Sequence, residues 1–152
     1  LLNRLASSGV PPDHIELEVT ESIMAESLPQ LEILREAGLR LAIDDFGTGF
    51  SCLSYLKRLP VTTLKLDREF VRDLESDNAD KALITAMIAV ARELELDTVA
   101  EGVETEGQLS FLRAQRCTQL QGYLLGKPKP IRVFLEELAS QRGQSDLVHG
   151  AA

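Results

Sequence analysis

Acidic side chains recur directly after short apolar stretches of this sequence, and a lysine and a glutamine occupy similar places. In chain order the candidate residues are Glu18, Glu21, Asp44, Asp45, Lys65, Asp67, Glu101, Glu104 and Gln121. Adjacent carboxylates such as those of Asp44 and Asp45 repel each other when buried, so one takes up a proton unless a cation lies nearby. Hard oxygen ligands without neighbouring cysteine or histidine select Mg²⁺ or Mn²⁺ over zinc. The pattern therefore predicts a site for divalent metal ions.

The pair Asp44-Asp45 also indicates a reaction. One aspartate could bridge two cations about 3.5–4 Å apart while its neighbour binds only the second cation. Such cations would polarise a phosphodiester and lower the pKa of a bridging water toward about 7, so the pattern favours hydrolysis of a phosphate diester. The plain alternative is a surface turn in which an aspartate caps a helix before Gly47.

Lys65 lies inside the apolar stretch 64–66, where its ammonium would face either solvent or the interior. Taken alone, it fits a surface lysine whose aliphatic part covers apolar neighbours. Among so many carboxylates it is better interpreted as the cation that orients a water nucleophile or stabilises developing negative charge. A Schiff-base lysine, as in a class I aldolase barrel, is the rival chemistry. Gln121, before Gly122, gives a weaker signal, and a turn residue is its alternative interpretation.

Strands and helices alternate in the hydrophobic pattern that must position these residues. Strands are predicted over residues 15–19, 39–43, 62–66, 98–100 and 118–120, and a loop is expected from Asp44 on. Helices are predicted over 28–37, around 53–56, over 78–95 and from 130 onward. The apolar spacing assigns to their core faces Leu83, Ile84, Met87, Val90, Ala91 and Leu94 on the long helix, and Ile131, Phe134, Leu135 and Leu138 on the last one. Thr105 and Gln108 have the spacing of a capping box, which would open a helix that carries Leu109 and Leu112. Because helical crossovers return each strand in the same direction, we expect parallel pairing.

The position of the polar residues distinguishes between two α/β architectures. An open doubly wound sheet and a closed barrel both fit the alternation. Here nearly every strand ends in a reactive residue, which favours a barrel because all strand ends meet at one mouth. We therefore expect a modified TIM (β/α) barrel that is incomplete, with about five of the eight β/α units. Five strands cannot close, so the sheet would keep unpaired edges.

Composition restricts the partners. The net charge of −8, from 24 acidic and 16 basic side chains, repels polyanions, so we expect no nucleic-acid polymer as a partner. The two cysteines, Cys52 and Cys117, lack the spacing of a zinc site or a disulfide scaffold, which fits a reducing compartment. The longest apolar run, residues 82–91, is about half of a membrane span, so no membrane segment is expected in this chain.

Five segments together resemble a known family in order and spacing: Glu-Val-Thr-Glu-Ser (18–22), Asp-Asp-Phe-Gly-Thr-Gly (44–49), Leu-Lys-Leu-Asp (64–67), Glu-Gly-Val-Glu (101–104) and Gln-Gly-Tyr (121–123). They are similar to the EAL-domain phosphodiesterases, bacterial enzymes that linearise cyclic di-GMP to pGpG on a modified TIM barrel. The resemblance covers the chain up to about Leu138.

The resemblance implies a role for each matching residue. Glu18 would bind the first metal ion, Asp44 would bridge two ions, and Asp45 and Glu101 would complete the second site. Lys65 would contact the catalytic water, so that Lys65, Glu101 and Asp45 form the catalytic set.

Gln121 would lie in the same pocket, Glu21 would brace the loop after Asp45, and Glu104 would support the metal ligands from outside. Segment 45–55 resembles the loop that couples the metal site to a homodimer interface.

The sequence also departs from the family pattern. The Glu-Ala-Leu motif, the arginine after it and a metal-binding asparagine are absent, and they belong upstream of Leu1. We therefore expect residues 1–140 to be the C-terminal portion of such a domain, 141–152 to be a flexible tail, and this chain to be inactive alone. It would lie in the bacterial cytoplasm, as part of a larger, even membrane-anchored, protein. The alternative function is a non-catalytic module that senses cyclic di-GMP or binds a protein.

Overall fold

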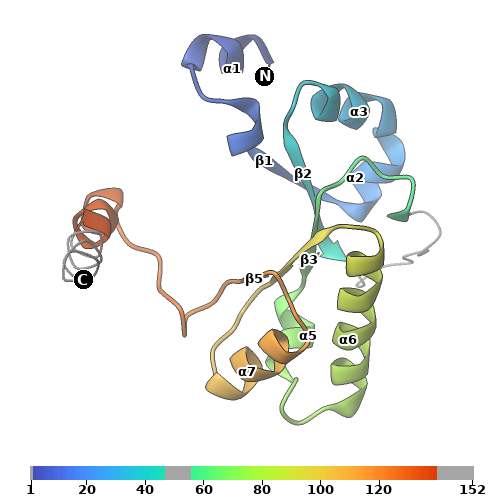
Figure 1. Ribbon diagram of the computed structural model, residues 1–152, viewed down its shortest axis with the longest axis vertical. Coiled ribbons are helices and arrows are strands. Elements are labelled where there is room, and N and C mark those ends of the chain that lie inside the picture. The colour runs from blue at the N-terminus through green and yellow to red at the C-terminus, as the bar shows by residue number, and fades with distance from the viewer. Residues whose placement is uncertain (1, 47–55, 140–152) are drawn as a thin grey trace, which may run out of the picture.

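The computed structural model describes residues 2–46 and 56–139, except for the side chains of Glu21, Ser22, Ala25 and Asp45. Five strands form one parallel sheet in chain order (Figure 1). They are β1 (Glu16–Thr20), β2 (Arg40–Phe46), β3 (Thr63–Leu66), β4 (Asp97–Ala100) and β5 (Gln119–Leu120). The predicted parallel pairing is confirmed for all four neighbouring strand pairs.

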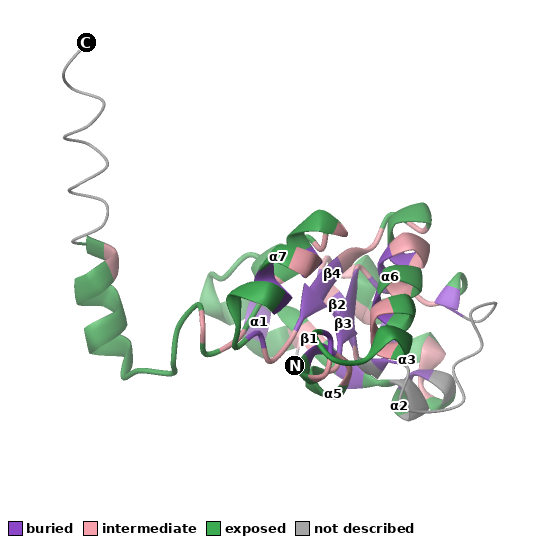
Figure 2. Cartoon of the chain, turned by 90° about the horizontal axis from the view of Figure 1, so that it is seen from below, coloured by how far each residue is buried: buried purple, intermediate pink, exposed green. Residues whose placement is uncertain are grey.

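Helices connect the strands, as expected for an α/β fold. Their bounds are α1 (Leu2–Ser8), the 3-10 helix η1 (Pro12–His14), α2 (Glu21–Glu26), α3 (Leu28–Glu36), α5 (Arg68–Arg72), α6 (Asn78–Glu93) and α7 (Glu106–Ala114). Residues 131–139 are helical as well, and both views show this helix apart from the sheet (Figures 1 and 2). In the described part of the chain, no helix combines the length and the apolar character that crossing a membrane requires.

The hydrophobic core lies between the sheet and the helices that cover it. All four residues of β3 are buried, and Leu41, Ile43 and Leu112 are fully enclosed. Figure 2 shows the buried strands with the exposed sides of the helices around them. Polar side chains of the same strands, such as Lys65 between Leu64 and Leu66, lie on the opposite face of the sheet.

Local signals in the sequence explain several boundaries. The predicted capping box is present: the Thr105 hydroxyl accepts from the N–H of Gln108, and the Gln108 side chain accepts from the N–H of Thr105. Gly38 ends α3 with a φ of +92°, a conformation that favours glycine. Asp67 caps α5 by accepting from the N–H of Glu69. Polar side chains thus begin helices where they satisfy free backbone donors.

The structure corrects some sequence-based boundaries. The second strand was predicted to end at residue 43, with Asp44 opening a loop, but β2 continues to Phe46. The short helices α2 and α5 were not predicted, and α6 ends at Glu93 rather than at residue 95. On α6, Leu83 was assigned to the apolar face but is 45% exposed, while Ile88 is buried.

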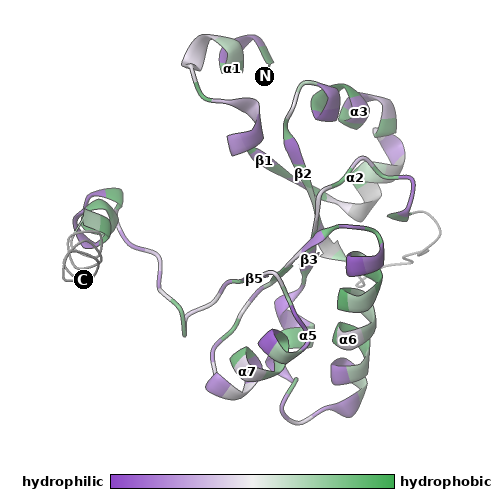
Figure 3. Cartoon of the chain, viewed as in Figure 1, coloured by the Kyte–Doolittle hydropathy of each residue, from purple (hydrophilic) through white to green (hydrophobic). Residues whose placement is uncertain are grey.

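The last helix also differs from expectation. Its predicted core face, which includes Ile131, Phe134 and Leu135, is exposed in the structure. Figure 3 shows hydrophobic residues on this isolated helix. Several predicted segments lie outside the described residues. They are the helix around residues 53–56 except for Leu56, the part of the loop 45–55 that begins at Gly47, and the tail 141–152.

Candidate active site

Three carboxylates from different strands meet at one buried ammonium group. Lys65 Nζ lies 2.8 Å from Glu18 Oε2, 2.8 Å from Asp44 Oδ1 and 2.7 Å from Glu101 Oε1. Only 6% of Lys65 is exposed to solvent. Glu18 comes from β1, Asp44 from β2 and Glu101 from the residue after β4. The four side chains, named here the Lys65 cluster, gather at the carboxyl end of the sheet.

The period of two along each strand explains why Lys65 points into this cluster. Successive side chains of a strand alternate between the two faces of the sheet. Leu64 and Leu66 belong to the hydrophobic core, so Lys65 between them must face the other side. Glu101 extends the ladder by donating its N–H to the carbonyl of Leu66, at 3.1 Å. Lys65 and Glu101 are therefore held on neighbouring strands of the same sheet.

A bulge in β2 places the two aspartates. Ile43 pairs with Leu64 and Phe46 pairs with Leu66, so Asp44 and Asp45 together stand opposite Lys65. An extra residue of this kind bends the strand and redirects its side chains, and bulges are frequent beside active sites. The bulge gives a physical reason why two consecutive strand residues need not point to opposite faces.

The ammonium of Lys65 stays charged in this environment. Burial opposes the charged form, but the hydrogen bonds to Asp44, Glu101 and Glu18 outweigh burial and raise the pKa of Lys65 above its usual range. A Schiff-base lysine needs a neutral amine and thus a lowered pKa. The aldolase-like alternative is therefore disfavoured.

The donor set suits a hard divalent cation. The cluster offers carboxylate oxygens, which Mg²⁺, Mn²⁺ and Ca²⁺ prefer, and three carboxylates face a single ammonium. Among the described side chains, no group of three acidic, histidine or cysteine residues is already arranged around a common metal position. The Lys65 ammonium instead occupies the point where the carboxylates converge.

Two other predicted site residues are described only by their backbone. Glu21 begins α2 directly after Thr20, whose strand partner is Asp44. Asp45 lies in β2, within the bulge. The backbone of both residues is thus next to Asp44, while their side chains lie outside the described part.

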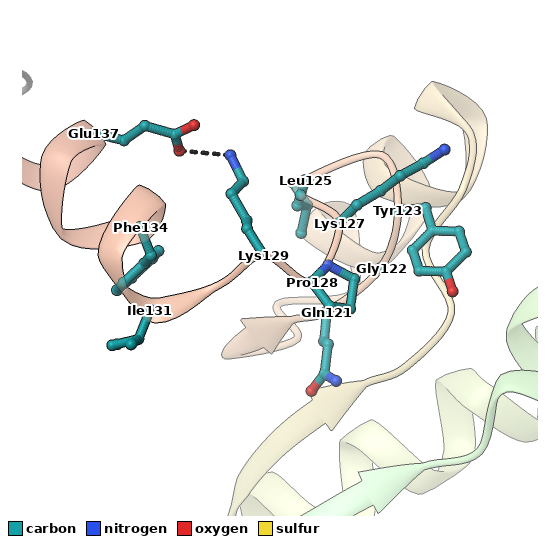
Figure 4. A pocket seen from close by; sticks show the side chains of 11 residues that line it. Gln121, Gly122, Tyr123, Leu125, Lys127, Pro128, Lys129, Ile131, Phe134 and Glu137 are labelled. Carbon is teal, nitrogen blue, oxygen red and sulfur yellow. Dashed lines mark hydrogen bonds and ion pairs between the residues drawn. The ribbon is translucent and has the colours of Figure 1, made fainter.

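Gln121 and Glu104 lie at exposed positions. The backbone of Gln121 donates to the carbonyl of Ala100 and accepts from Val103, so this residue extends the ladder after β5. Its side chain lines an open hollow, together with Tyr123, Lys127 and the start of the last helix (Figure 4). Glu104 lines a smaller hollow with Arg68, Arg72 and Gln108.

Sequence reasoning missed two polar groups. The Gln108 side chain is buried, at 4% exposure. Besides its part in the capping box, it donates a hydrogen bond to the carbonyl of Arg72 on α5. At the amino ends of the strands, Arg40 bonds Glu16 and Asp97, and Thr63 donates to Glu16 at 2.6 Å. The signal for this second group is its position: each residue starts a strand and lies an even number of residues before a member of the Lys65 cluster.

Comparisons with known proteins agree with this geometry. The family model of the EAL domain matches residues 1–128. The cyclic di-GMP phosphodiesterase NbdA of Pseudomonas aeruginosa is 46% identical over 142 residues, which cover 91% of this chain and 18% of NbdA. The chain therefore spans less than a fifth of the length of that relative.

Solved structures show the same similarity. The MucR phosphodiesterase of Pseudomonas aeruginosa, in complex with c-di-GMP, has a TM-score of 0.82 and 48% identity, over 87% of this chain and 55% of that one. BlrP1 of Klebsiella pneumoniae, solved with manganese and c-di-GMP, has a TM-score of 0.74 and 35% identity. That match covers 81% of this chain and 32% of BlrP1.

Proposed function

The chain belongs to the EAL domain family, and on this premise we propose that it forms part of a phosphodiesterase domain that hydrolyses cyclic di-GMP to linear pGpG. The observation that carries the proposal is the convergence of Glu18, Asp44 and Glu101 on the buried Lys65. Related proteins solved with c-di-GMP support the choice of substrate.

Glu18, Asp44, Asp45 and Glu101 would hold two divalent cations, Mg²⁺ or Mn²⁺, with Asp44 between them. Bound there, such cations polarise a phosphodiester and lower the pKa of a bound water. The manganese and calcium complexes of BlrP1 support a divalent ion in this family.

The residues of the chain supply the remaining functions. Lys65, held charged among the carboxylates, donates hydrogen bonds to the attacking water or to a phosphoryl oxygen and so stabilises developing negative charge. Asp45 and Glu101 complete the catalytic set. Gln121 contacts the substrate at the rim, and Glu21 and Glu104 support the residues of the site.

We extend the proposal to the molecular context. Residues 1–140 act as the C-terminal portion of the EAL domain within a TIM-type barrel, and residues 141–152 form a tail. Segment 45–55 contributes to a homodimer interface, and the domain works in the bacterial cytoplasm without a nucleic-acid polymer as partner.

The test removes one charge at a time. In the intact protein that contains this chain, Asp44→Asn or Lys65→Met abolishes production of pGpG from cyclic di-GMP in the presence of Mn²⁺, as measured by chromatography. Asp13→Asn and Lys57→Met, at exposed positions, are the matched controls and leave turnover unchanged. Undiminished turnover in Asp44→Asn or Lys65→Met would refute the assignment.

A binding module is the second candidate, and one observation favours it. The described carboxylates contact Lys65 rather than forming a ready metal position. We also propose that the 152-residue chain alone turns over little or no substrate, because the Glu-Ala-Leu motif and the metal-binding asparagine of the family pattern are not among its residues. Calorimetry that detects cyclic di-GMP binding, with no product over hours, would support a sensing module; brisk metal-dependent hydrolysis by this chain would exclude it.

A further inference from the structure

The loop between Glu101 and α7 is held by one buried side chain. Gln108 Oε1 accepts hydrogen bonds from the N–H of Glu104, at 2.7 Å, and of Thr105, at 3.0 Å. Its Nε2 donates to the carbonyl of Arg72, at 3.3 Å. Because a buried amide is costly to leave unpaired, these bonds fix the loop and the end of α5 relative to each other.

The two segments that Gln108 joins are those that follow the reactive residues. Arg72 is the last residue of α5, which begins just after β3 and Lys65. Glu104 follows Glu101 by three residues, within the loop that leads to α7. Gln108 therefore connects the element that follows Lys65 with the loop that follows Glu101.

Gly102, which follows Glu101 in the loop, packs closely against α5. Gly102 has a φ of +72°, and a Cβ there would lie 2.7 Å from Cβ of Arg68 on α5. The residue next to Glu101 thus touches the same short helix that Gln108 holds. If α5 moves relative to the loop, the backbone at Gly102 must move too, and the Glu101 carboxylate moves with it.

From this arrangement we propose that Gln108 is a positioning residue that directs the Glu101 carboxylate toward Lys65. The inference rests on the proposed function for its catalytic consequence, but not for its geometry. Gln108 acts through the loop and touches no member of the Lys65 cluster among its hydrogen-bond partners.

The capping box allows the loop and the helix to be tested separately. Thr105 Oγ1 accepts from the N–H of Gln108 and so serves the start of α7, whereas Gln108 Oε1 serves the loop. Gln108→Met keeps an unbranched side chain but removes both loop bonds. Gln108→Glu keeps the acceptor for the loop but replaces the Nε2 donor by an oxygen, so it breaks the bond to the Arg72 carbonyl on α5. Thr105→Val removes the helix cap and leaves the Gln108 acceptor, so it is the matched control for lost stability.

Two measurements on the intact protein decide the proposal. The first is steady-state turnover of cyclic di-GMP: Gln108→Met lowers kcat roughly tenfold or more with KM nearly unchanged, and Gln108→Glu, which breaks only the bond to Arg72, lowers kcat by a smaller factor. The second needs no turnover. Pulse labelling with an amine-reactive reagent and mass spectrometry follows Lys65, with the exposed Lys57 as internal reference. Gln108→Met raises the labelling of Lys65 severalfold, because one of its three carboxylate partners turns away.

Each outcome has a defined meaning. Thr105→Val lowers the melting temperature but leaves kcat and Lys65 labelling at the wild-type level. The proposal is overturned if Gln108→Met changes neither quantity, or if Thr105→Val changes both as strongly. If Gln108→Met does not fold, Gln108→Glu decides, because wild-type kcat and wild-type Lys65 labelling after loss of the bond to Arg72 contradict the role. A wild-type protein without turnover refutes the proposed enzyme, while Lys65 labelling in the variants still tests the positioning.

Discussion

At the scale of single residues, the properties of the site depend on Lys65. Its side chain is buried within a fully buried strand, on the face opposite the hydrophobic core, and its ammonium holds three carboxylates that would otherwise repel one another. Removing the lysine leaves partly buried negative charges without a partner, a change that is strongly destabilising in protein interiors. Lys65 thus contributes both to the stability of the fold and to the arrangement of the carboxylates in the proposed site.

This coupling predicts a pH dependence. Partners raise the folded-state pKa of Lys65 above the ordinary value of 10.5, so its contribution to stability is complete below pH 10.5 and is lost as pH rises beyond it. Lys65→Met should therefore unfold at lower urea than wild type at neutral pH, and the difference should narrow above pH 10.5. Lys57→Met, which changes an exposed lysine, should show no such trend. A difference that stays constant into the alkaline range would contradict the prediction.

At the scale of elements, the strands carry two polar layers on the face opposite the core. The Lys65 cluster lies at the carboxyl ends, and the group of Arg40, Glu16, Thr63 and Asp97 lies at the amino ends. In barrels of this type, the carboxyl ends carry catalysis, and residues at the amino ends serve stability. Substitutions in the Lys65 cluster should therefore lower activity, whereas substitutions in the group at the amino ends should lower stability and leave activity unchanged.

Arg40→Met tests this division. Its guanidinium bridges β1 and β4, but the side chain is 36% exposed, so solvent screens both ion pairs. We expect a loss of about 1 kcal/mol in unfolding free energy, or about 3 °C in melting temperature, with unchanged turnover of cyclic di-GMP. Arg92→Met, on the exposed surface of α6, should leave both quantities unchanged. A large fall in kcat in Arg40→Met would place the amino-end layer in the catalytic machinery.

Two glycines after β5 provide a second pair of element-scale variants. A Cβ on Gly122 would lie 2.1 Å from the carbonyl oxygen of Val103, whereas a Cβ on Gly126 would meet nothing within 4 Å. Gly122→Ala must separate the turn after β5 from the loop after β4, at a cost of roughly 1–3 kcal/mol. Thermal denaturation should show this loss for Gly122→Ala and little change for Gly126→Ala. Equal melting temperatures would mean that this close approach is not required.

The sequence allowed most elements to be predicted, because strands between helices leave a strong apolar pattern. The end of β2 could not be located, because Asp44 and Asp45 resemble a loop until the bulge opposite Lys65 is known. The five-residue helix α5 is too short for a periodic signal. On α6, the buried face depends on how the helix rotates against the sheet, which puts Ile88 inside and Leu83 outside.

The candidate site was predictable as a set of residue types but not as an arrangement. Alternating carboxylates after apolar strands indicated metal chemistry, and the family resemblance named the same residues. That Glu18, Asp44 and Glu101 meet on one ammonium is a tertiary property, since it requires strand register and the face on which Lys65 points. The role of Gln108 was hidden because its spacing already had a sufficient explanation as a helix cap.

At the scale of the whole molecule, the described chain leaves apolar surface uncovered. Within the described residues, β1 and β5 form the edges of the sheet, and the helix of residues 131–139 stands apart from it (Figure 1). Ile131 is 70% exposed and Leu135 is 56% exposed. Unpaired strand edges and apolar patches of this kind promote association, although the net charge of −8 opposes it.

We therefore expect the 152-residue chain on its own to associate. Sedimentation velocity should show a weight-average mass that rises with protein concentration, because burial of apolar side chains between copies outweighs charge repulsion once salt screens the acidic surface. Replacing Ile131 and Leu135 together by glutamine should shift the population toward monomer. Ile33→Gln, at a similarly exposed apolar residue on α3, is the matched control and should leave the distribution unchanged, since the proposed contact involves the last helix. A monomer at all concentrations would show that neither the isolated helix nor the sheet edges act as adhesive surfaces.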